Sequence, residues 1–482
     1  MTAIVLPAPD LRVVAARDTI VAGLVAILGA RHVIASFDER RAYETDGFNA
    51  YRAVPLAVVL PGTTDEVSRV LEFLCEHRVK VVARGAGTSL SGGAIPSEDC
   101  VVVGLARMNR ILAIDYENRT ARVEAGVTNI NITHAVSGRG FFYAPDPSSQ
   151  LACTIAGNIA MNSGGAHCLK YGVTTNNLLG VRMVLVDGTI VDLGGDALDA
   201  PGYDLLGLIT GSEGQLGIVT EATVRILRAA EGARPMLMGF DSAEAAGCCV
   251  AAIIGSGILP VAIEYMDRPC IHACEAFAHA GYPLDVEALL IVEVEGSEAE
   301  IDDLLQRITF IAMRFAPKVM RTSKSEAETA AIWKGRKAAF GAVGQIAEAY
   351  FCMDGVIPTG RLPEVLTKVA AICAGHGVKV ANVFHAGDGN LHPLILYDPN
   401  NPAELAAAEE AGADILKLCV DVGGCLTGEH GVGIEKRDLM PFQFNRQDLV
   451  LQMAVKSALD PQWLLNPGKV FPLEGRPAAV IG

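Results

Sequence analysis

Apolar and polar residues follow two different periods along the chain. In residues 63–77, TTDEVSRVLEFLCEH, the apolar positions recur every three or four residues and form one helical stripe. Thr63 precedes that stripe and Glu66 follows three residues later, a pattern typical of a helix start. The next segment, VKVVA at residues 79–83, is apolar and β-branched, and therefore predicts a buried strand.

Helical and strand patterns of this kind alternate from about residue 20 to residue 228. The run AAEGARP follows Arg228 and indicates a domain boundary, and a second stretch of helices and strands ends with the helical pattern DLVLQMAVKSAL. A chain of 482 residues exceeds what one hydrophobic core usually serves. We therefore expect an α+β protein with one domain at residues 1–228 and a second, α/β domain with an antiparallel sheet at residues 229–482.

Composition narrows the class of protein. Hydrophobic residues make up 51% of the chain, charged residues 20%, and the net charge is −16, which argues against a general affinity for nucleic acid or anionic lipid. The 12 cysteines are scattered without C-x-x-C pairs, which is typical of reduced thiols in the cytoplasm. The longest apolar run, residues 248–263, contains two glycines and a proline and is too short for a membrane span. No direct membrane insertion is expected.

Two histidines flank a glycine-rich stretch in HAGDGNLHP, residues 385–393. The flanking segments VKVANVF and LILY are β-branched and aromatic, so we predict strand, turn and strand with the turn at Gly387 to Asn390. His385 and His392 would then face each other across the ladder with Cβ atoms roughly 5 Å apart. They could share one metal ion, or they could be two hydrogen-bonded histidines at a loop.

A glycine-rich loop, RGAGTSLSGG at residues 84–93, follows the predicted strand at 79–83. Backbone N–H groups in such a loop can form a concave site for a phosphate. A Rossmann loop would open a helix and be followed by an acidic residue for the ribose, but here Pro96 and the strand-like CVVVGL follow. Residues 145–165 and 210–224 supply two further loops rich in glycine, serine and threonine, and three such loops suit a long ligand with a pyrophosphate in its middle.

These three loops together resemble the FAD-binding domain of the vanillyl-alcohol-oxidase type flavoproteins. The later motifs HAGDGNLHP, GEHGVG and NPGKVF resemble the carboxy-terminal domain of the FAD-linked 2-hydroxyacid branch of those proteins. Within that branch the chain is most similar to the FAD subunits of bacterial glycolate oxidases, with D-lactate and D-2-hydroxyglutarate dehydrogenases as relatives. The resemblance spans roughly residues 35–472.

The resemblance implies a two-part FAD-binding domain at residues 1–228 and a substrate- and metal-binding domain at residues 229–482, whose C-terminal tail returns to the flavin. The first loop of the FAD-binding domain would hold the pyrophosphate, the second would line the flavin ring, and the third would lie along the nucleotide portion. The residues implied in FAD binding are Arg84, Gly85, Ala86, Gly87, Thr88, Ser89, Pro145, Asp146, Ser149, Thr154, Gly157, Asn158, Gly164, Gly165, Glu213, Gly217, Ile218 and Val219. SLSGG offers no histidine for a covalent link, so we expect non-covalent FAD, with His167 making a polar contact rather than a tether.

The resemblance also implies the chemistry of the second domain. Oxidation of a 2-hydroxy acid removes a hydroxyl proton and passes a hydride to flavin N5, which calls for a base, a carboxylate anchor and a group that acidifies the alcohol. In the relatives the corresponding residues are two histidines and a glutamate that bind a divalent metal, and a histidine base. Carried over, His385, His392 and Glu429 would bind Zn²⁺, with Mn²⁺ or Fe²⁺ as alternatives, and His430 would take the proton.

Arg336 matches the arginine that the relatives use against the substrate carboxylate, and a guanidinium can hold that group with two hydrogen bonds. Two departures bear on the substrate. Cys352 stands where the 2-hydroxyglutarate enzymes carry a lysine, and Leu394 stands where they carry an asparagine. A second carboxylate would lack its partners, so a small monocarboxylic acid, glycolate or D-lactate, is expected.

The same resemblance implies partner subunits, one of them an iron–sulfur protein, and a cytoplasmic chain held peripherally at the inner face of a bacterial membrane through those partners. An alternative function is that of a metal-dependent hydrolase or metal-binding protein that uses His385, His392 and Glu429 without flavin. A third is an inactive assembly subunit that keeps the fold.

Overall fold

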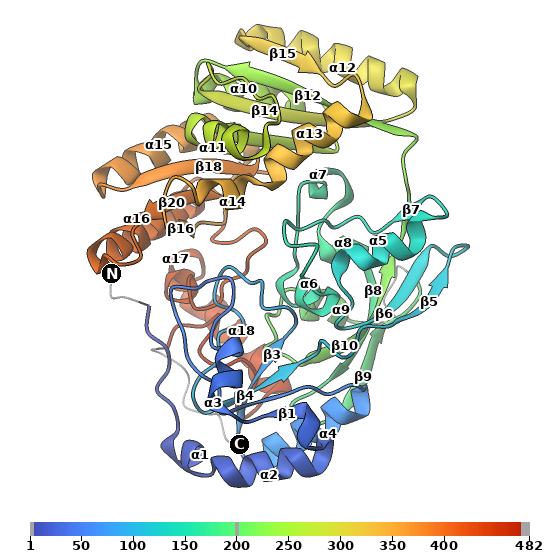
Figure 1. Cartoon of the computed structure of the whole chain (residues 1–482), viewed down its shortest axis with the longest axis vertical. Coiled ribbons are helices and arrows are strands. Elements are labelled where there is room, and N and C mark those ends of the chain that lie inside the picture. The colour runs from blue at the N-terminus through green and yellow to red at the C-terminus, as the bar shows by residue number, and fades with distance from the viewer. Residues whose placement is uncertain (1–3, 198–201, 474–482) are drawn as a thin grey trace. The chain divides into compact units, whose positions relative to one another are not determined.

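The computed structural model describes residues 4–197 and 202–473 (Figure 1). The chain forms two compact units. The N-terminal unit contains residues 4–164 and 173–228 and the segment from His430 onward, and the central unit contains residues 165–172 and 229–429. The chain passes between the units after Arg228 and again after Glu429, so the described residues 430–473 belong to the N-terminal unit.

The N-terminal unit contains two main sheets. The first has the order β1-β2-β4-β3, in which β4 is parallel to β2 and β3. The second has the order β5-β6-β10-β8-β9 and is antiparallel throughout. The strands are β1 (Val33–Ile34), β2 (Ala57–Val59), β3 (Lys80–Arg84), β4 (Cys100–Gly104), β5 (Ile111–Asp115), β6 (Thr120–Glu124), β8 (Leu178–Val184), β9 (Ile190–Gly194) and β10 (Ile218–Arg225), with the short pair β7 (Phe141–Phe142) and β11 (Leu227–Arg228) beside them.

One hydrophobic core joins these sheets to the helices of the unit. The helices are α1 (Leu11–Ala15), α2 (Arg17–Leu28), α3 (Phe37–Arg40), α4 (Thr64–Glu76), α5 (Asn129–Ser137), α6 (Ile155–Met161), α8 (Thr174–Asn177), α9 (Leu205–Ile209), α17 (Met440–Gln443) and α18 (Arg446–Leu459). Helix α4 confirms the predicted helix: the Thr63 hydroxyl accepts the Glu66 N–H at 3.1 Å, and the apolar stripe is buried. Strand β3 and helix α18 also lie where the sequence predicted them.

The central unit is built on one large antiparallel sheet with the order β15-β12-β14-β13-β18-β19-β17, to which β20 and β16 are added through β18. Its strands are β12 (Gly232–Phe240), β13 (Ala262–Asp267), β14 (Ala288–Gly296), β15 (Val319–Thr322), β16 (Ala349–Cys352), β17 (Gly355–Val356), β18 (Lys379–His385), β19 (Asn390–Leu391) and β20 (Pro393–Tyr397). Its helices are α7 (Cys168–Tyr171), α10 (Ala243–Gly255), α11 (Arg268–Ala278), α12 (Glu298–Ala312), α13 (Glu326–Lys337), α14 (Ala339–Val343), α15 (Leu362–Gly375) and α16 (Pro402–Asp421). The expected antiparallel sheet is therefore present.

The strand, turn and strand predicted around HAGDGNLHP is present, but its register differs from the prediction. The turn runs from Ala386 to Gly389, and His385 pairs with Asn390 instead of His392. Gly389 has a φ of 79°, a conformation that glycine adopts without strain, so it ends the turn one residue earlier than expected. Because side chains alternate with a period of two, His392 still lies on the same face as Asn390.

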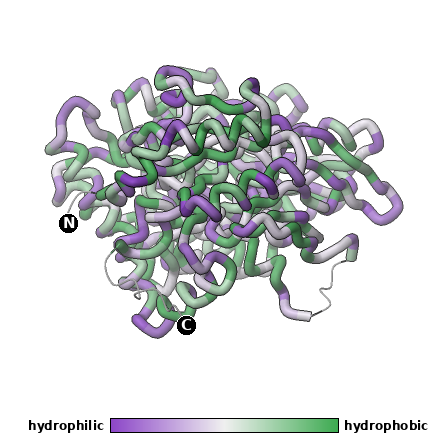
Figure 2. Tube along the Cα trace, turned by 90° about the horizontal axis from the view of Figure 1, so that it is seen from below, coloured by the Kyte–Doolittle hydropathy of each residue, from purple (hydrophilic) through white to green (hydrophobic). Residues whose placement is uncertain are grey.

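No helix in the described part of the chain is both long and apolar enough to cross a membrane. Hydrophilic residues recur along the whole trace in Figure 2, and they interrupt its hydrophobic stretches.

Candidate active site

The glycine-rich loop that follows β3 is held against the segment 43–48 by backbone contacts. Arg84 Nη1 donates a hydrogen bond to the Thr45 carbonyl at 2.7 Å. Gly47 lies so close to the loop that a Cβ there would come within 2.7 Å of the Ser89 carbonyl oxygen. No helix begins in this loop, and β4 follows it, as the sequence predicted. The loop therefore offers backbone N–H groups and hydroxyls to a ligand, without a helix dipole.

The second loop approaches the first at one point. A Cβ on Gly85 would lie 2.2 Å from Thr154 Oγ1, so only glycine leaves room there. Thr154 Oγ1 is buried and has no hydrogen-bond partner in the described part of the chain. A buried hydroxyl without a partner is unfavourable unless another group satisfies it. Glycine and an unsatisfied hydroxyl side by side fit a ligand with polar atoms, and the residues present therefore fit FAD.

A buried hydrogen bond holds the second loop to helix α5. Asn158 accepts from Asn129 Nδ2 at 3.0 Å, and the same Nδ2 group donates to the Pro145 carbonyl at 3.0 Å. Gly164 and Gly165 follow α6, and the chain passes from the N-terminal unit to the central unit between them. These residues of the predicted FAD set thus lie on one structured segment of the chain.

The third loop uses its charged residue in a way that the sequence did not reveal. Both carboxylate oxygens of Glu213 accept backbone N–H groups, from Val432 at 2.6 Å and from Gly433 at 2.8 Å. Burial raises the pKa of Glu213. Ile218 and Val219 open β10 and their side chains lie in the hydrophobic core. Glu213 therefore ties this loop to the segment that follows His430.

The three predicted metal ligands come together in the central unit. The ligand atoms of His385, His392 and Glu429 all lie within 4.8 Å of one another. Glu429 Oε1 is 3.1 Å from His392 Nε2 and 3.5 Å from His385 Nε2. The two imidazole rings are 5.3 Å apart and nearly perpendicular, with an interplanar angle of 88°. Two imidazoles and one carboxylate form a donor set that suits Zn²⁺ and leaves a coordination position open.

The electrostatics of this set favour a cation. Burial alone lowers the pKa of His385, but Glu264 and Glu429 outweigh burial, so the pKa of His385 lies well above its ordinary value. Burial alone raises the pKa of Glu429, but hydrogen bonds with His385 and His392 hold that pKa well below its ordinary value. The two carboxylates of Glu264 and Glu429 are therefore stabilised by positive charge at this largely buried place, and the residues present fit a divalent metal.

A second layer of residues orients this donor set, and the sequence analysis did not single them out. His385 Nδ1 lies 2.8 Å from Glu264 Oε1, while Glu264 Oε2 accepts a hydrogen bond from Arg336 Nε at 2.7 Å and forms an ion pair with Nη2 at 2.5 Å. Glu264 is fully buried on β13. Arg336 is the predicted carboxylate anchor, and two of its nitrogens are engaged by Glu264. The only signal in the sequence was a glutamate within the otherwise apolar strand AIEYM.

The loop that carries Glu429 is shaped by Asp354, which is also fully buried. Its carboxylate accepts the N–H groups of Gly428 at 3.0 Å and Glu429 at 3.1 Å, and the Thr427 hydroxyl at 2.6 Å. His430 follows Glu429 directly, where the chain enters the N-terminal unit, and its carbonyl accepts from Ser91 Oγ at 2.8 Å. The structure thus anchors the backbone on both sides of the Glu429–His430 bond.

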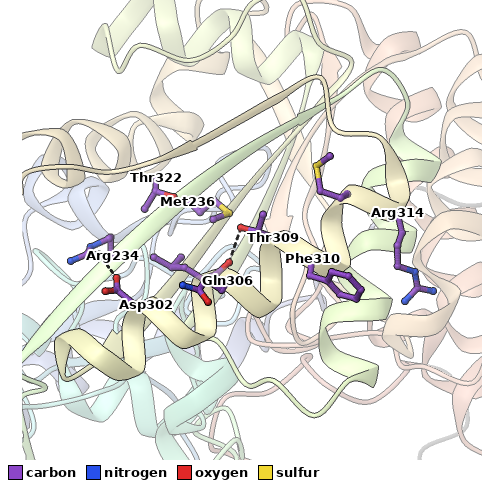
Figure 3. Close-up of a pocket in the computed structure, with 10 residues that line it drawn as sticks. Arg234, Met236, Asp302, Gln306, Thr309, Phe310, Arg314 and Thr322 are labelled. Carbon is purple, nitrogen blue, oxygen red and sulfur yellow. Dashed lines mark hydrogen bonds and ion pairs between the residues drawn. The ribbon is translucent and has the colours of Figure 1, made fainter.

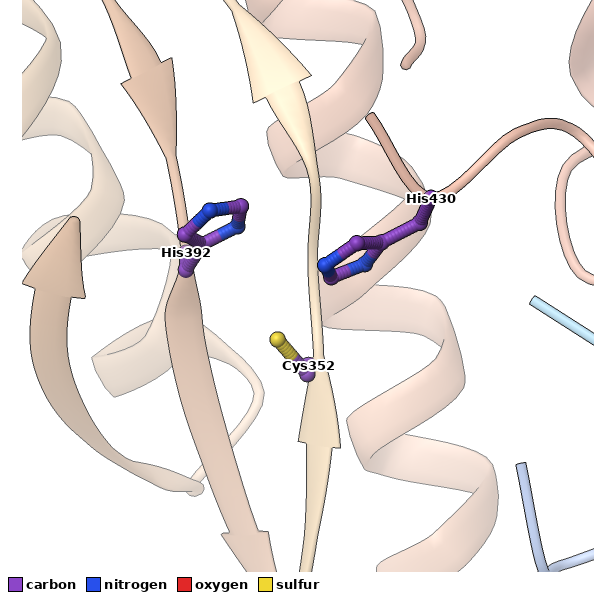
Figure 4. Close-up of side chains that lie close together, drawn as sticks. All are labelled: Cys352, His392 and His430. Carbon is purple, nitrogen blue, oxygen red and sulfur yellow. The ribbon is translucent and has the colours of Figure 1, made fainter. Parts of the chain in front are cut away.

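Two positions that bear on substrate size are neighbours. Cys352 on β16 pairs with Leu394 on β20 in the ladder, and both are buried in a hydrophobic cluster of the central unit. The side chains of Cys352 and His392 project from neighbouring segments of the sheet in Figure 4, and their Sγ and ring nitrogen lie within 4.8 Å. The wall beside His392 is therefore apolar on this side.

His167, the residue that the sequence analysis considered for a flavin contact, makes a polar contact with a protein side chain. Its Nε2 lies 3.2 Å from Glu293 Oε2, and Glu293 Oε1 accepts from Trp333 Nε1 at 2.7 Å. This histidine is thus engaged within the central unit.

A hollow in the central unit contains none of the predicted site residues (Figure 3). It lies along α12 and the neighbouring strands. The guanidinium group of Arg234, which lines the hollow, forms ion pairs with Asp302 at 3.1 Å and Glu298 at 2.6 Å. It offers no histidine or cysteine for the chemistry considered above.

Comparison with known protein families covers most of the chain. Residues 55–194 match the family of FAD binding domains, and residues 230–470 match the family described as the C-terminal domain of FAD linked oxidases. The glycolate oxidase subunit GlcD of Escherichia coli strain K12 is 51% identical over 430 residues, which are 89% of this chain and 86% of the relative. The D-lactate dehydrogenase of Anaerostipes hadrus is 30% identical over 435 residues, which are 87% of this chain and 90% of the relative.

The fold has solved counterparts. The structure of 4-ethylphenol oxidase from Gulosibacter chungangensis in its isoeugenol complex superimposes on this chain with a TM-score of 0.80 at 18% identity. The match covers 98% of this chain and 100% of that chain. This likeness in fold and the match to the FAD binding domain family together confirm the expected fold class. With the two family matches and the relative at 51% identity, the chain belongs to the FAD-linked oxidases.

Proposed function

We propose that this FAD-linked oxidoreductase oxidises a small D-2-hydroxy acid, glycolate or D-lactate, to the 2-oxo acid. The observation that carries the proposal is the convergence of His385, His392 and Glu429 within 4.8 Å, at a largely buried place in a member of the FAD-linked oxidases. The relatives that share this family include proteins named as a glycolate oxidase subunit and a D-lactate dehydrogenase.

Arg84 to Ser89, Pro145 to Asn158 with Gly164 and Gly165, and Glu213 to Val219 would hold FAD without a covalent link. FAD, when bound, supplies the acceptor for the hydride that leaves the substrate carbon, at flavin N5. The support for this assignment is the family match together with the unsatisfied Thr154 hydroxyl beside Gly85.

His385 Nε2, His392 Nε2 and Glu429 Oε1 would hold a divalent metal, with Zn²⁺ expected from the ligand types and Mn²⁺ or Fe²⁺ as alternatives. The metal, when bound, supplies a Lewis acid that acidifies the substrate hydroxyl. Supporting this assignment, the Nδ1 atoms face Glu264 and the Met353 carbonyl, so both Nε2 atoms are available to a common ligand position.

His430 would accept the hydroxyl proton at a ring nitrogen while the hydride leaves the same substrate carbon, so that the alcohol becomes a carbonyl. Arg336 would bind the substrate carboxylate. Its Nε and Nη2 are held by Glu264, and its Nη1 has no hydrogen-bond partner in the described part of the chain. That nitrogen, on an oriented guanidinium, is the one available to an anion.

The apolar pair of Cys352 and Leu394 favours a substrate with one carboxylate. A second carboxylate placed against this wall would be desolvated without a partner, which costs far more than the roughly 2–7 kcal/mol of an unpaired neutral polar group. Glycolate and D-lactate meet this condition and D-2-hydroxyglutarate does not.

The name of the E. coli relative describes it as a subunit, so partner subunits are expected here as well. An iron–sulfur protein among them would take electrons onward, since oxygen is not the expected main acceptor. Such partners would hold a cytoplasmic chain peripherally at the inner face of the membrane. The hydrolase alternative is not favoured, because the family match supplies an FAD-binding domain.

An anaerobic reduction experiment tests the proposal. Purified protein, loaded with FAD and metal, is mixed with glycolate, D-lactate, L-lactate or D-2-hydroxyglutarate, and the flavin absorption is followed. Glycolate or D-lactate should bleach the flavin, whereas L-lactate and D-2-hydroxyglutarate should bleach it far more slowly. Chelation should abolish the bleaching and added Zn²⁺ or Mn²⁺ should restore it. A colourless protein, or full activity without metal, would contradict the proposal.

A further inference from the structure

We propose that Glu264 is a positioning residue that fixes the tautomer of His385 and thereby makes its Nε2 atom a metal ligand. The inference rests on the metal site of the proposed function. It concerns a residue that no motif in the sequence indicated, and it explains why a glutamate is buried completely in the middle of an apolar sheet.

The geometry begins with strand pairing. Glu264 on β13 is the direct antiparallel partner of His385 on β18. Its Oε1 lies 2.8 Å from His385 Nδ1, and Glu264 is 0% exposed. Side chains on directly opposed positions of two strands are within reach of each other, so this contact is set by the register of the sheet.

The second oxygen of Glu264 determines the direction of the first hydrogen bond. Oε2 accepts a hydrogen bond from Arg336 Nε at 2.7 Å and forms an ion pair with Nη2 at 2.5 Å. A guanidinium only donates hydrogen bonds, and it keeps the neighbouring carboxylate in its ionised, accepting form. Oε1 must therefore accept as well, so His385 Nδ1 carries the hydrogen.

A neutral imidazole with its hydrogen on Nδ1 has its lone pair on Nε2. His385 Nε2 lies 3.5 Å from Glu429 Oε1, on the side where the three ligand atoms converge. Histidine ligands of metals generally donate their other N–H group to a carboxylate or carbonyl, which fixes the ring and raises its basicity. His392 follows the same rule, because its Nδ1 faces the Met353 carbonyl at 3.4 Å.

The variant Glu264→Gln separates this role from simple packing. Glutamine has nearly the same shape, but only one of its terminal atoms can accept. If that oxygen accepts from Arg336, the amide N–H points at His385 Nδ1 and favours the tautomer with the hydrogen on Nε2. That tautomer cannot bind a metal through Nε2.

Glu293→Gln is the matched control. Glu293 lies on the neighbouring strand β14, is 4% exposed, and also contacts one histidine and one N–H donor, His167 at 3.2 Å and Trp333 at 2.7 Å. Neither of these partners is a predicted metal ligand. The variant therefore reports what the loss of a buried carboxylate does to the sheet without disturbing His385.

The experiment measures the Zn²⁺ affinity of the three FAD-loaded proteins by competition with a chromophoric chelator, alongside their FAD content and thermal midpoint. We expect Glu264→Gln to bind Zn²⁺ about 10–100-fold more weakly than wild type, the usual effect of losing such a partner, and Glu293→Gln to bind it as wild type does.

Equal affinities in wild type and Glu264→Gln would overturn the inference alone. Equal weakening in both variants would overturn it too, because the effect would then belong to the sheet. A wild-type protein that binds no Zn²⁺, Mn²⁺ or Fe²⁺ would overturn the proposed metal site and the inference with it.

A second measurement does not depend on a variant of Glu264 that folds. In metal-free wild-type protein labelled with ¹⁵N-histidine, the resonances of His385 are identified by their loss in His385→Gln. At a pH high enough for His385 to be neutral, a hydrogen on Nδ1 supports the inference. A neutral His385 with its hydrogen on Nε2 overturns it.

Discussion

The two parts of the candidate active site are built from different materials. In the N-terminal unit the predicted FAD loops offer mainly backbone groups and hydroxyls, and glycines make room, as at Gly85 against Thr154 Oγ1. In the central unit the predicted metal site is made of charged side chains on strands and one loop, and each is held by another buried charge or carbonyl, as Glu264 holds His385. A ligand approached by backbone needs space, whereas a small cation needs a few fixed donor atoms.

This difference teaches which substitutions each region should tolerate. Adding volume should damage the loops, because the atoms that bind belong to the backbone and cannot be replaced. Removing or altering a terminal polar atom should damage the site in the central unit, because the geometry depends on a chain of side-chain contacts. Substitutions of the two kinds should therefore separate the two regions.

The largest effect is expected for His430→Ala. Loss of a general base slows a proton transfer by about 10²–10⁴-fold, so reduction of the flavin by glycolate or D-lactate should slow by about 100-fold or more. FAD and metal content should stay at wild-type levels, because neither assigned set of binding residues includes His430. Stopped-flow absorbance under anaerobic conditions measures the rate. Unchanged reduction would remove His430 from the mechanism.

The next substitution adds one methyl group to a predicted FAD loop of the N-terminal unit. In Gly85→Ala the new Cβ would lie 2.2 Å from Thr154 Oγ1, so the loop or the threonine must shift. Overpacking of this kind costs about 1–3 kcal/mol, which corresponds to a loss of FAD affinity of about 5- to 150-fold. Equilibrium dialysis of apoprotein with FAD measures it, while Zn²⁺ affinity should not change.

Gly138→Ala is the control for that substitution. A Cβ on Gly138 would meet open space in the described part of the chain, and its φ of −60° suits any residue, so alanine fits there without strain. FAD affinity like that of wild type in both variants would show that the close approach at Gly85 does not matter for the cofactor.

The contrast between the regions also explains what the sequence could predict. The FAD loops are contiguous segments, and their glycine and hydroxyl pattern after a β-branched strand is visible without any knowledge of pairing. Helix α4 and strands β3 and β4 were predictable for the same reason, since their signals lie within a dozen residues. The predicted metal ligands His385, His392 and Glu429 could be named through motifs that resemble a known family.

The supporting residues could not be predicted in this way. Glu264 and His385 are 121 positions apart, and only the pairing of β13 with β18 brings them together. Asp354 supports Glu429 across 75 positions in the same manner. The register of the strands on either side of the turn between His385 and His392 was also not predictable, because the turn ends at Gly389 and not at Asn390. Long-range register is set by the packing of a whole sheet, and a single sequence read locally does not contain it.

Glu213 sharpens the comparison, because it is a side chain that supports the loop region. In Glu213→Gln one of the two oxygens that accept from Val432 and Gly433 becomes an N–H group, which faces another donor. An unsatisfied buried donor costs about 1–3 kcal/mol, so the free energy of unfolding should fall by that amount. Urea unfolding followed by circular dichroism measures the change, and Glu76→Gln on the exposed side of α4 should show none. Equal stability of the Glu213 variant would mean that these bonds are replaced by water.

Asp267 offers the smallest expected effect and tests whether every buried carboxylate of the central unit serves the predicted metal site. It caps α11 through the Cys270 N–H at 3.2 Å and accepts from Asn382 N and Nδ2 at 2.8 Å, and burial raises its pKa to about 6. Because this pKa lies above the value of 3.8 in an unfolded chain, the stability linked to the proton is fully present below pH 3.8 and is lost as pH rises through about 6.

Asp267→Asn removes that titration. The stability of wild type relative to this variant should therefore fall by about 1 kcal/mol between about pH 5 and pH 8, as measured by urea unfolding. The exposed control Asp421→Asn should show no such trend, and Zn²⁺ affinity should not change in either variant. A difference that does not vary with pH would mean that Asp267 stays ionised throughout, and the hydrogen bonds that it accepts would then outweigh its burial.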